Sequence, residues 1–146
     1  MASRNNNSRG YDWSSLKKGY YDLEGYLRRE LIVEEADKIG KRLVKDKLSR
    51  NQLRNFYNEV KALDAKIDEV NFYENLPFIL MLKAKASYAY KWGRTNSKIP
   101  ESFYEFIETN IEIIEGKAEP KTFKGFVKFF ETVVAYFYGH GGEDNR

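Results

Sequence analysis

Apolar residues recur at intervals of three and four in the middle of the chain, and this spacing constrains the fold more than any other feature. The row consists of Leu53, Phe56, Val60, Leu63, Ile67 and Val70. A heptad pattern of this kind places one apolar face along an α-helix, and another helix must cover that face. Ser49 and Gln52 form a capping-box pattern that predicts where this helix begins. The chain is therefore expected to pack helix against helix.

Four further helices are expected around this one. The first runs from about Leu23 to Lys47, with apolar positions at Ile32, Ala36, Ile39 and Leu43. The fourth follows Pro100 and the fifth follows Pro120. Their apolar rows are Phe103, Phe106, Ile107, Ile111 and Ile114 in the fourth, and Phe123, Phe126, Val127, Phe130, Val133, Val134 and Phe137 in the fifth.

The third helix is expected over Leu76 to Arg94, with Pro77 at its first position and Gly93 at its end. Residues 78–82 are all apolar and point to every side of the helix. A helix that is apolar all round is normally buried, so this one is predicted to lie in the middle of the protein.

The fold class predicted from these patterns is all-α, a compact bundle of about five helices. Residues 21–138 are expected to form a single helical domain. Residues 1–20 contain many Asn, Ser and Gly residues and are interpreted as a flexible N-terminal arm. Residues 139–146 are expected to be a loose C-terminal tail.

Several function classes are disfavoured by composition. The chain has no cysteine, which excludes disulfides and thiolate metal sites and favours a cytoplasmic location. No apolar run is long enough to span a membrane. The sole histidine, His140, follows a glycine in a Gly-rich tail, and no phosphate-binding loop is present. We therefore expect no enzyme activity, no metal site and no cofactor.

Basic residues form rows on three of the expected helices. In the second helix Arg50, Arg54 and Lys61 share one face with Tyr57. In the third, Lys83, Lys91 and Arg94 share a polar stripe, with Lys85 nearly opposite; residues 75–100 contain no acid. In the fifth, Lys121, Lys124 and Lys128 are spaced at intervals of three and four residues. Rows of this kind beside aromatic side chains suit a phosphate backbone, although lysine rows are also common on solvated surfaces.

Three blocks of sequence together resemble a known family. They are LSRNQLRNFYNEVKAL, LPFILMLKAKASYAYKWGR and FKGFVKFFETVVAYF, in this order. The combination is similar to the small subunit of the type III-A CRISPR–Cas effector, the Csm complex. The resemblance covers roughly Leu48 to Phe137. The first helix matches only in character, and the N-terminal arm does not match.

The resemblance implies a helical, non-catalytic RNA-binding protein. Copies would stack inside a ribonucleoprotein filament and contact the backbones of guide RNA and paired target RNA, beside the other subunits of the Csm complex. The candidate RNA-binding residues from the family blocks and the charge pattern together are Arg50, Arg54, Lys61, Lys83, Lys85, Lys91, Arg94 and Lys128.

An alternative from a different class is a helical self-association module that binds no nucleic acid. The heptad row and the many aromatic residues would then form a homodimer. The two hypotheses are compatible, because a small subunit taken alone could pair through surface that it otherwise gives to its neighbours.

Overall fold

The computed structural model describes residues 10–93 and 98–142. Within them the chain forms five α-helices and no β-strand beyond an isolated bridge between Tyr21 and Leu27. The α-helices are α2 (Ala36–Lys45), α3 (Arg50–Lys66), α4 (Phe72–Trp92), α5 (Glu101–Gly116) and α6 (Pro120–Gly139). A short 3₁₀ turn, η1 (Leu16–Lys18), and a π-helical turn, η2 (Leu31–Glu35), precede them. The all-α prediction is therefore confirmed.

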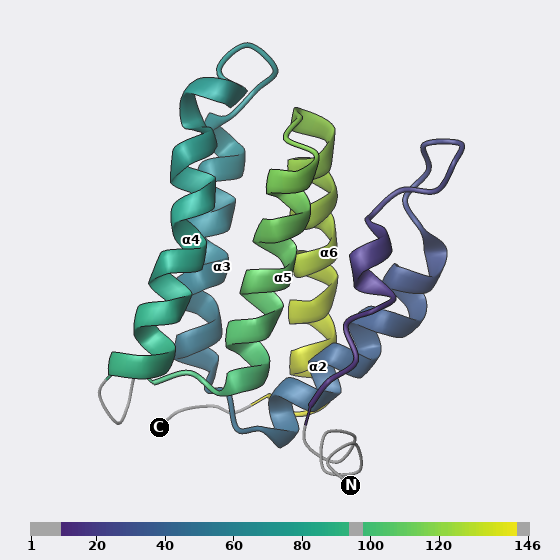
Figure 1. The fold of residues 1–146 in the computed structure, drawn as a ribbon. Helices are drawn as coiled ribbons and strands as arrows, with labels where there is room; N and C mark the ends of the chain where they lie inside the picture. The colour runs from purple at the N-terminus through teal and green to yellow at the C-terminus, as the bar shows by residue number, and fades with distance from the viewer. Residues whose placement is uncertain (1–9, 94–97, 143–146) are drawn as a thin grey trace, which may run out of the picture.

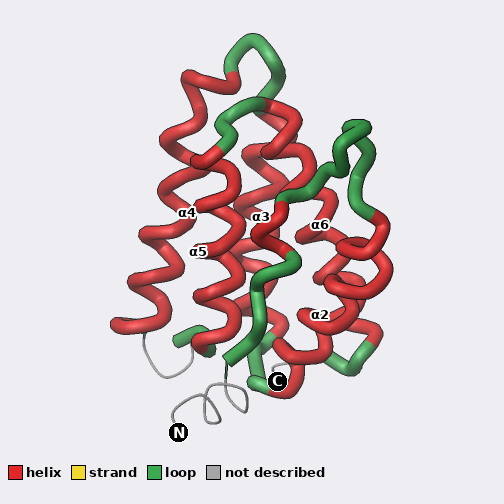
Figure 2. Tube along the Cα trace, turned by 45° about the vertical axis from the view of Figure 1, so that its right-hand side comes forward, coloured by secondary structure: helices red, strands yellow, loops and turns green. Residues whose placement is uncertain are grey.

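Helices α3, α4, α5 and α6 form a bundle in which α3 and α5 each contact both α4 and α6. Figure 1 shows α4 at one edge and α2 at the other, with α2 packed across α6. The turned view in Figure 2 shows the N-terminal segment running along the outside of this layer. The core between the helices is strongly aromatic, and Phe103, Phe106, Phe126 and Phe130 are fully buried in it.

The apolar rows predicted for the fourth and fifth helices are all buried, which explains why α5 and α6 form the centre of the molecule. The heptad row of α3 is buried from Leu53 to Ile67, the residue that caps the end of the helix. It does not continue to Val70, because α3 ends at Lys66 and Val70 lies in the following turn, where it is 93% exposed. Asp68 and Asn71 stabilise that turn through side-chain bonds to its backbone.

The predicted flexible arm is wrong for residues 10–20. Trp13, Leu16 and Tyr20 are buried in the core, and the Trp13 indole nitrogen donates to Glu105 at 2.9 Å. Although the N-terminal segment is rich in Asn and Ser, it contains these three large apolar side chains, which pack over α5 and α6. Residues 1–9 of the arm and 143–146 of the tail lie outside the described residues.

The first helix begins later than the expected Leu23. Residues 22–26 form a turn in which Gly25 has a φ of 86°, a left-handed conformation that glycine adopts without strain. Asp22 stabilises this turn by accepting the backbone N–H groups of Glu24 and Tyr26. Leu23 consequently points to solvent.

The third helix differs most from its prediction. It begins at Phe72, so Pro77 lies inside α4 rather than at its start; the predicted end at Gly93 is confirmed. Helix α4 lies at an edge of the bundle, and Phe78 and Met81 are each half exposed. The expectation of a central, fully covered helix is therefore wrong. No helix within residues 10–93 and 98–142 is long and apolar enough to cross a membrane.

Candidate nucleic-acid interface

Helices α3 and α6 run antiparallel and share a basic face. At one end the guanidinium carbon of Arg50 lies 4.9 Å from the centre of the Tyr138 ring. At the other end the Lys124 ammonium contacts the Asp64 carboxylate at 2.5 Å. Because Arg50 begins α3 and Tyr138 lies near the end of α6, these two contacts fix the register of the pair.

The capping box predicted from the sequence positions the first cation of this face. The Ser49 hydroxyl accepts the backbone N–H of Gln52 at 3.1 Å, and the Gln52 side chain accepts the backbone N–H of Ser49 at 2.8 Å. Gln52 also donates to the carbonyl of Lys98 at 2.5 Å, which ties the start of α3 to the segment before α5. Arg50 therefore lies at a rigid helix start.

Tyr57 packs between the two helices in the middle of the face. Its ring lies nearly perpendicular to the Phe130 ring, with 5.4 Å between centroids. Burial raises the pKa of Tyr57, and the nearby carboxylates of Glu131 and Asp64 raise it further, so the phenol stays neutral. Arg54 and Lys61 flank Tyr57 on α3, three residues before it and four after.

We call this surface the α3–α6 face. It consists of Arg50, Arg54, Tyr57, Lys61, Lys124 and Lys128, with the carboxylates of Asp64 and Glu131. Three of its cations, Arg54, Lys61 and Lys128, form no ion pair with any residue in the described part of the chain. Arg54 and Lys128 are exposed and Lys61 is half-buried. The face thus carries excess positive charge toward solvent.

The candidates on α4 lie elsewhere. Lys83 contacts Glu112 of α5 at 3.3 Å, whereas Lys85 pairs with Glu59 of α3. These two lysines therefore lie on opposite sides of α4, and Glu59 lies on the side of α3 away from the α3–α6 face. Lys91 is exposed near the end of α4. Arg94 lies outside the described residues.

Residues 75–100 contain no acid in the sequence, but in the fold acidic residues of other helices lie beside them. Two of their lysines, Lys83 and Lys85, receive counter-charges from Glu112 and Glu59, which belong to neighbouring helices. A window of sequence shows only the charges along one segment, so it could not reveal these partners. The absence of local acids is weaker evidence for an anion-binding surface than the sequence alone indicated.

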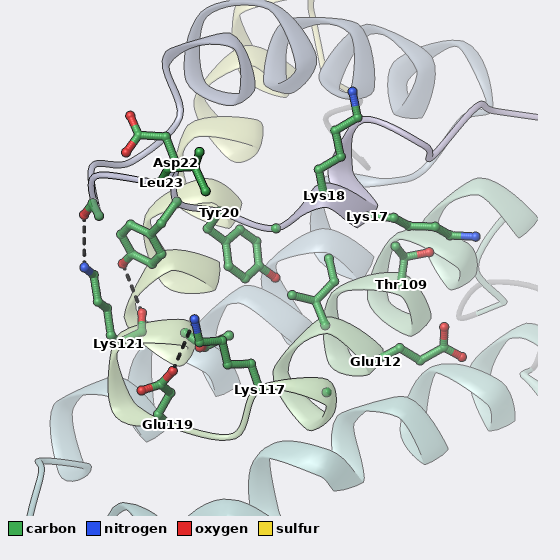
Figure 3. A pocket seen from close by; sticks show the side chains of 16 residues that line it. Lys17, Lys18, Tyr20, Asp22, Leu23, Thr109, Glu112, Lys117, Glu119 and Lys121 are labelled. Carbon is green, nitrogen blue, oxygen red and sulfur yellow. Dashed lines mark hydrogen bonds and ion pairs between the residues drawn. The ribbon is translucent and has the colours of Figure 1, made fainter.

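A cleft of about 700 Å³ opens where the N-terminal segment crosses the connection between α5 and α6 (Figure 3). Lys121 donates to the Gly25 carbonyl at 3.0 Å and lies over the Tyr21 ring, and Tyr21 donates to the Lys121 carbonyl at 3.0 Å. Lys117 pairs with Glu119 at 3.6 Å. Sequence reasoning missed this cleft because it treated residues 1–20 as an arm. The bonds that Lys121 and Tyr21 form across the cleft fasten the N-terminal segment to the start of α6.

The position of His140 in a Gly-rich tail indicated an isolated side chain, but the structure gives it a partner. Its Nε2 atom lies 2.5 Å from Asp37 of α2, which joins the end of α6 to the first helix. Within the residues that the structure describes, no group of three or more histidine, aspartate or glutamate side chains could hold a metal ion.

Comparison with known families identifies the chain. Residues 27–143 match the family model described as Csm2 Type III-A. The chain belongs to the Csm2 family. It is therefore a small subunit of the type III-A Csm effector, and the resemblance drawn from the three sequence blocks is confirmed. The matched region includes the five α-helices of the described residues and every candidate basic residue. No curated protein and no solved structure matches the chain.

Proposed function

We propose that this subunit binds the phosphate backbones of guide RNA and paired target RNA through the α3–α6 face, beside the other subunits of the Csm complex. The observation that carries the proposal is that Arg54, Lys61 and Lys128 gather on one face without an ion pair to any described residue. Cations in this state interact with phosphates without first losing a protein partner. We assign no catalytic step to this chain.

The character of the face supports binding that does not depend on base sequence. Its groups are arginine and lysine side chains on two rigid helices, whereas modules that read bases present aromatic sheets or grooves to unstacked bases. The aromatic ring between Arg54 and Lys61, that of Tyr57, packs nearly perpendicular to the Phe130 ring and is half-buried. The proposed site therefore holds the backbone, and the pairing of guide with target supplies the sequence specificity.

Salt dependence tests this proposal. The logarithm of RNA affinity should fall linearly with the logarithm of salt concentration, with a slope of about −0.7 for each phosphate neutralised on a single strand. Arg54→Gln should lower the steepness of that slope by roughly one phosphate and leave the melting temperature nearly unchanged, since Arg54 is exposed. Fluorescence anisotropy with a labelled single-stranded RNA measures both.

Arg29→Gln is the matched control, because Arg29 is also an exposed arginine but precedes η2 on the far side of α6 from α3. Its salt slope should equal that of the unchanged protein. Equal RNA affinity at about 50 and about 500 mM salt would contradict the proposal. An equal loss of slope in both variants would show that overall charge, rather than the α3–α6 face, causes binding.

Self-association is a second candidate function, and one specific observation favours it. Among the large apolar side chains of α4 that are at least half exposed, four share one side of the helix: Phe78, Met81, Tyr88 and Trp92. Surface of this kind normally marks a contact with another protein. Pairing through apolar contacts should be weakened little by salt, which separates it experimentally from RNA binding.

A further inference from the structure

Helix α4 carries an apolar row on its outer side in addition to the one that faces the bundle. The inner row, with Ile79, Leu82 and Ala86, is buried. The outer row consists of Phe78, Met81, Lys85, Tyr88 and Trp92, at steps of three, four, three and four. This is the spacing of residues that face a partner helix in a coiled coil.

The outer row is open to solvent although its neighbour α3 lies close by. Phe78 and Met81 are each 50% exposed, Tyr88 is 65% exposed and Trp92 is 72% exposed. The contacts that reach it from α3 are polar: Glu59 pairs with Lys85, and the Lys66 ammonium lies 5.4 Å from the centre of the Phe78 ring. A shallow cavity of about 260 Å³ between α3 and α4 continues the surface beside Tyr88.

We propose that the outer row of α4 packs against the same row of a second copy of this chain, in antiparallel orientation, with the two-fold axis beside Lys85. The row is nearly symmetric about this residue, because Phe78 and Trp92 each lie seven residues from it, Met81 four residues before it and Tyr88 three after. An antiparallel partner centred there places Phe78 against Trp92 of the second copy and Met81 against Tyr88 of the second copy. Each end of the row thus meets an aromatic side chain of the second copy. The two-fold axis repeats every contact, as an isologous interface requires.

The charge at the centre of the row is compatible with this pairing. Two lysines facing each other across the axis would repel, but each Lys85 is neutralised by Glu59 of its own chain. In the dimer each carboxylate would also lie near the second lysine, since the axis brings both pairs together. Ala84 is exposed beside Lys85, and its small side chain leaves room for the second helix at the usual separation of about 8–10 Å.

The exposed area is sufficient for a weak dimer. Large side chains of these types carry about 150–250 Å² each, so the exposed parts of the four amount to roughly 500 Å² per copy. Two copies would bury roughly 1,000 Å², at the lower limit of specific interfaces. We therefore expect a concentration-dependent dimer. This inference rests on the self-association proposed above and is independent of the RNA-binding face.

Cysteine cross-linking tests the register cleanly, because the natural chain contains no cysteine. Lys85→Cys should form a covalent dimer under mild oxidation, since the axis brings the two copies of this position together. A mixture of Met81→Cys and Tyr88→Cys chains should form the mixed dimer. Met81→Cys alone should not cross-link, whereas a parallel pairing would link it to itself. Val33→Cys, exposed on η2, is the control and should stay monomeric.

Sedimentation of the unchanged protein separates this inference from the self-association on which it rests. A strict monomer at concentrations well above micromolar would overturn both, and the outer row would then belong to a different subunit. A dimer in which Lys85→Cys does not cross-link, or in which Met81→Cys links to itself, would overturn the antiparallel register alone. Tyr88→Glu should abolish the dimer, while Val33→Glu should not.

Discussion

The hydroxyl of Tyr20 connects the N-terminal segment to the centre of the bundle. It donates to the side-chain oxygen of Asn110 at 2.6 Å, and the Asn110 amide donates to the Phe106 carbonyl at 2.8 Å. Both side chains are almost fully buried. Burial raises the pKa of Tyr20 well above its usual value, which keeps the phenol protonated as the donor. This buried bond therefore helps to hold in place a segment that composition alone described as loose.

Tyr20→Phe should destabilise the protein by about 1–3 kcal/mol, because it leaves the Asn110 oxygen buried without a donor. The matched control is Tyr21→Phe, which removes a bond from a less buried hydroxyl to the Lys121 carbonyl and should cost less, because water can replace the lost donor. Urea unfolding measures both variants. If the two substitutions cost the same, the Tyr20–Asn110 bond does not hold the segment.

Helical spacing in the sequence predicted which candidate residues share a helix face, but not which side chains they contact. Arg50, Arg54 and Lys61 lie on one face because helical spacing alone determines their positions. The partners of Lys83 and Lys85 come from α5 and α3, and depend on how helices pack, which spacing within one helix cannot show. Phe129 does not belong to the apolar row predicted for the fifth helix, yet it is fully buried, and its ring contacts that of Tyr20.

At the scale of elements, the contact between α2 and α6 depends on a glycine. A Cβ atom added to Gly40 would lie 2.8 Å from the Cβ of Tyr136 and 2.9 Å from the backbone nitrogen of Phe137. One of these atoms belongs to the backbone of α6 and the other is attached directly to it, so neither can move unless the helix itself shifts. Gly40 therefore lets the two helices approach closely, a role that helical spacing alone does not reveal.

Gly40→Ala should destabilise the protein by about 1–3 kcal/mol through overpacking, although alanine is the better helix former. Gly116→Ala is the control, because nothing lies within 4 Å of its added Cβ at the end of α5. It should be neutral or slightly stabilising. Thermal unfolding of both variants checks the prediction, and a stabilised Gly40→Ala protein would show that α2 does not pack as described.

Apolar spacing predicted a helix's position correctly where the helix has one distinct apolar face and one distinct polar face. This held for α5 and α6, whose rows are continuous and buried. It failed for α4, because apolar residues on every side were taken to indicate a central helix. The same pattern arises when one side faces the bundle and the other faces solvent or a second chain, and sequence alone does not distinguish these cases.

At the scale of the whole molecule, the described helices present two different surfaces. The α3–α6 face is cationic, and the outer row of α4 is apolar with one neutralised lysine. Helix α3 separates them, since Glu59 lies on its α4 side and Tyr57 on its α6 side. A small subunit built in this way could hold RNA with one surface and another protein with the other, without competition between them.

Lysine acetylation of the full chain, with and without single-stranded RNA at low salt, tests the central claim most directly. Lys61 and Lys128 are accessible cations of the α3–α6 face, whereas Lys17 is exposed on η1, which packs against α5. RNA should protect Lys61 and Lys128 strongly and leave Lys17 unchanged, and high salt should remove the protection. Equal protection of all three lysines, or protection of Lys17 alone, would contradict the assignment of RNA binding to the α3–α6 face.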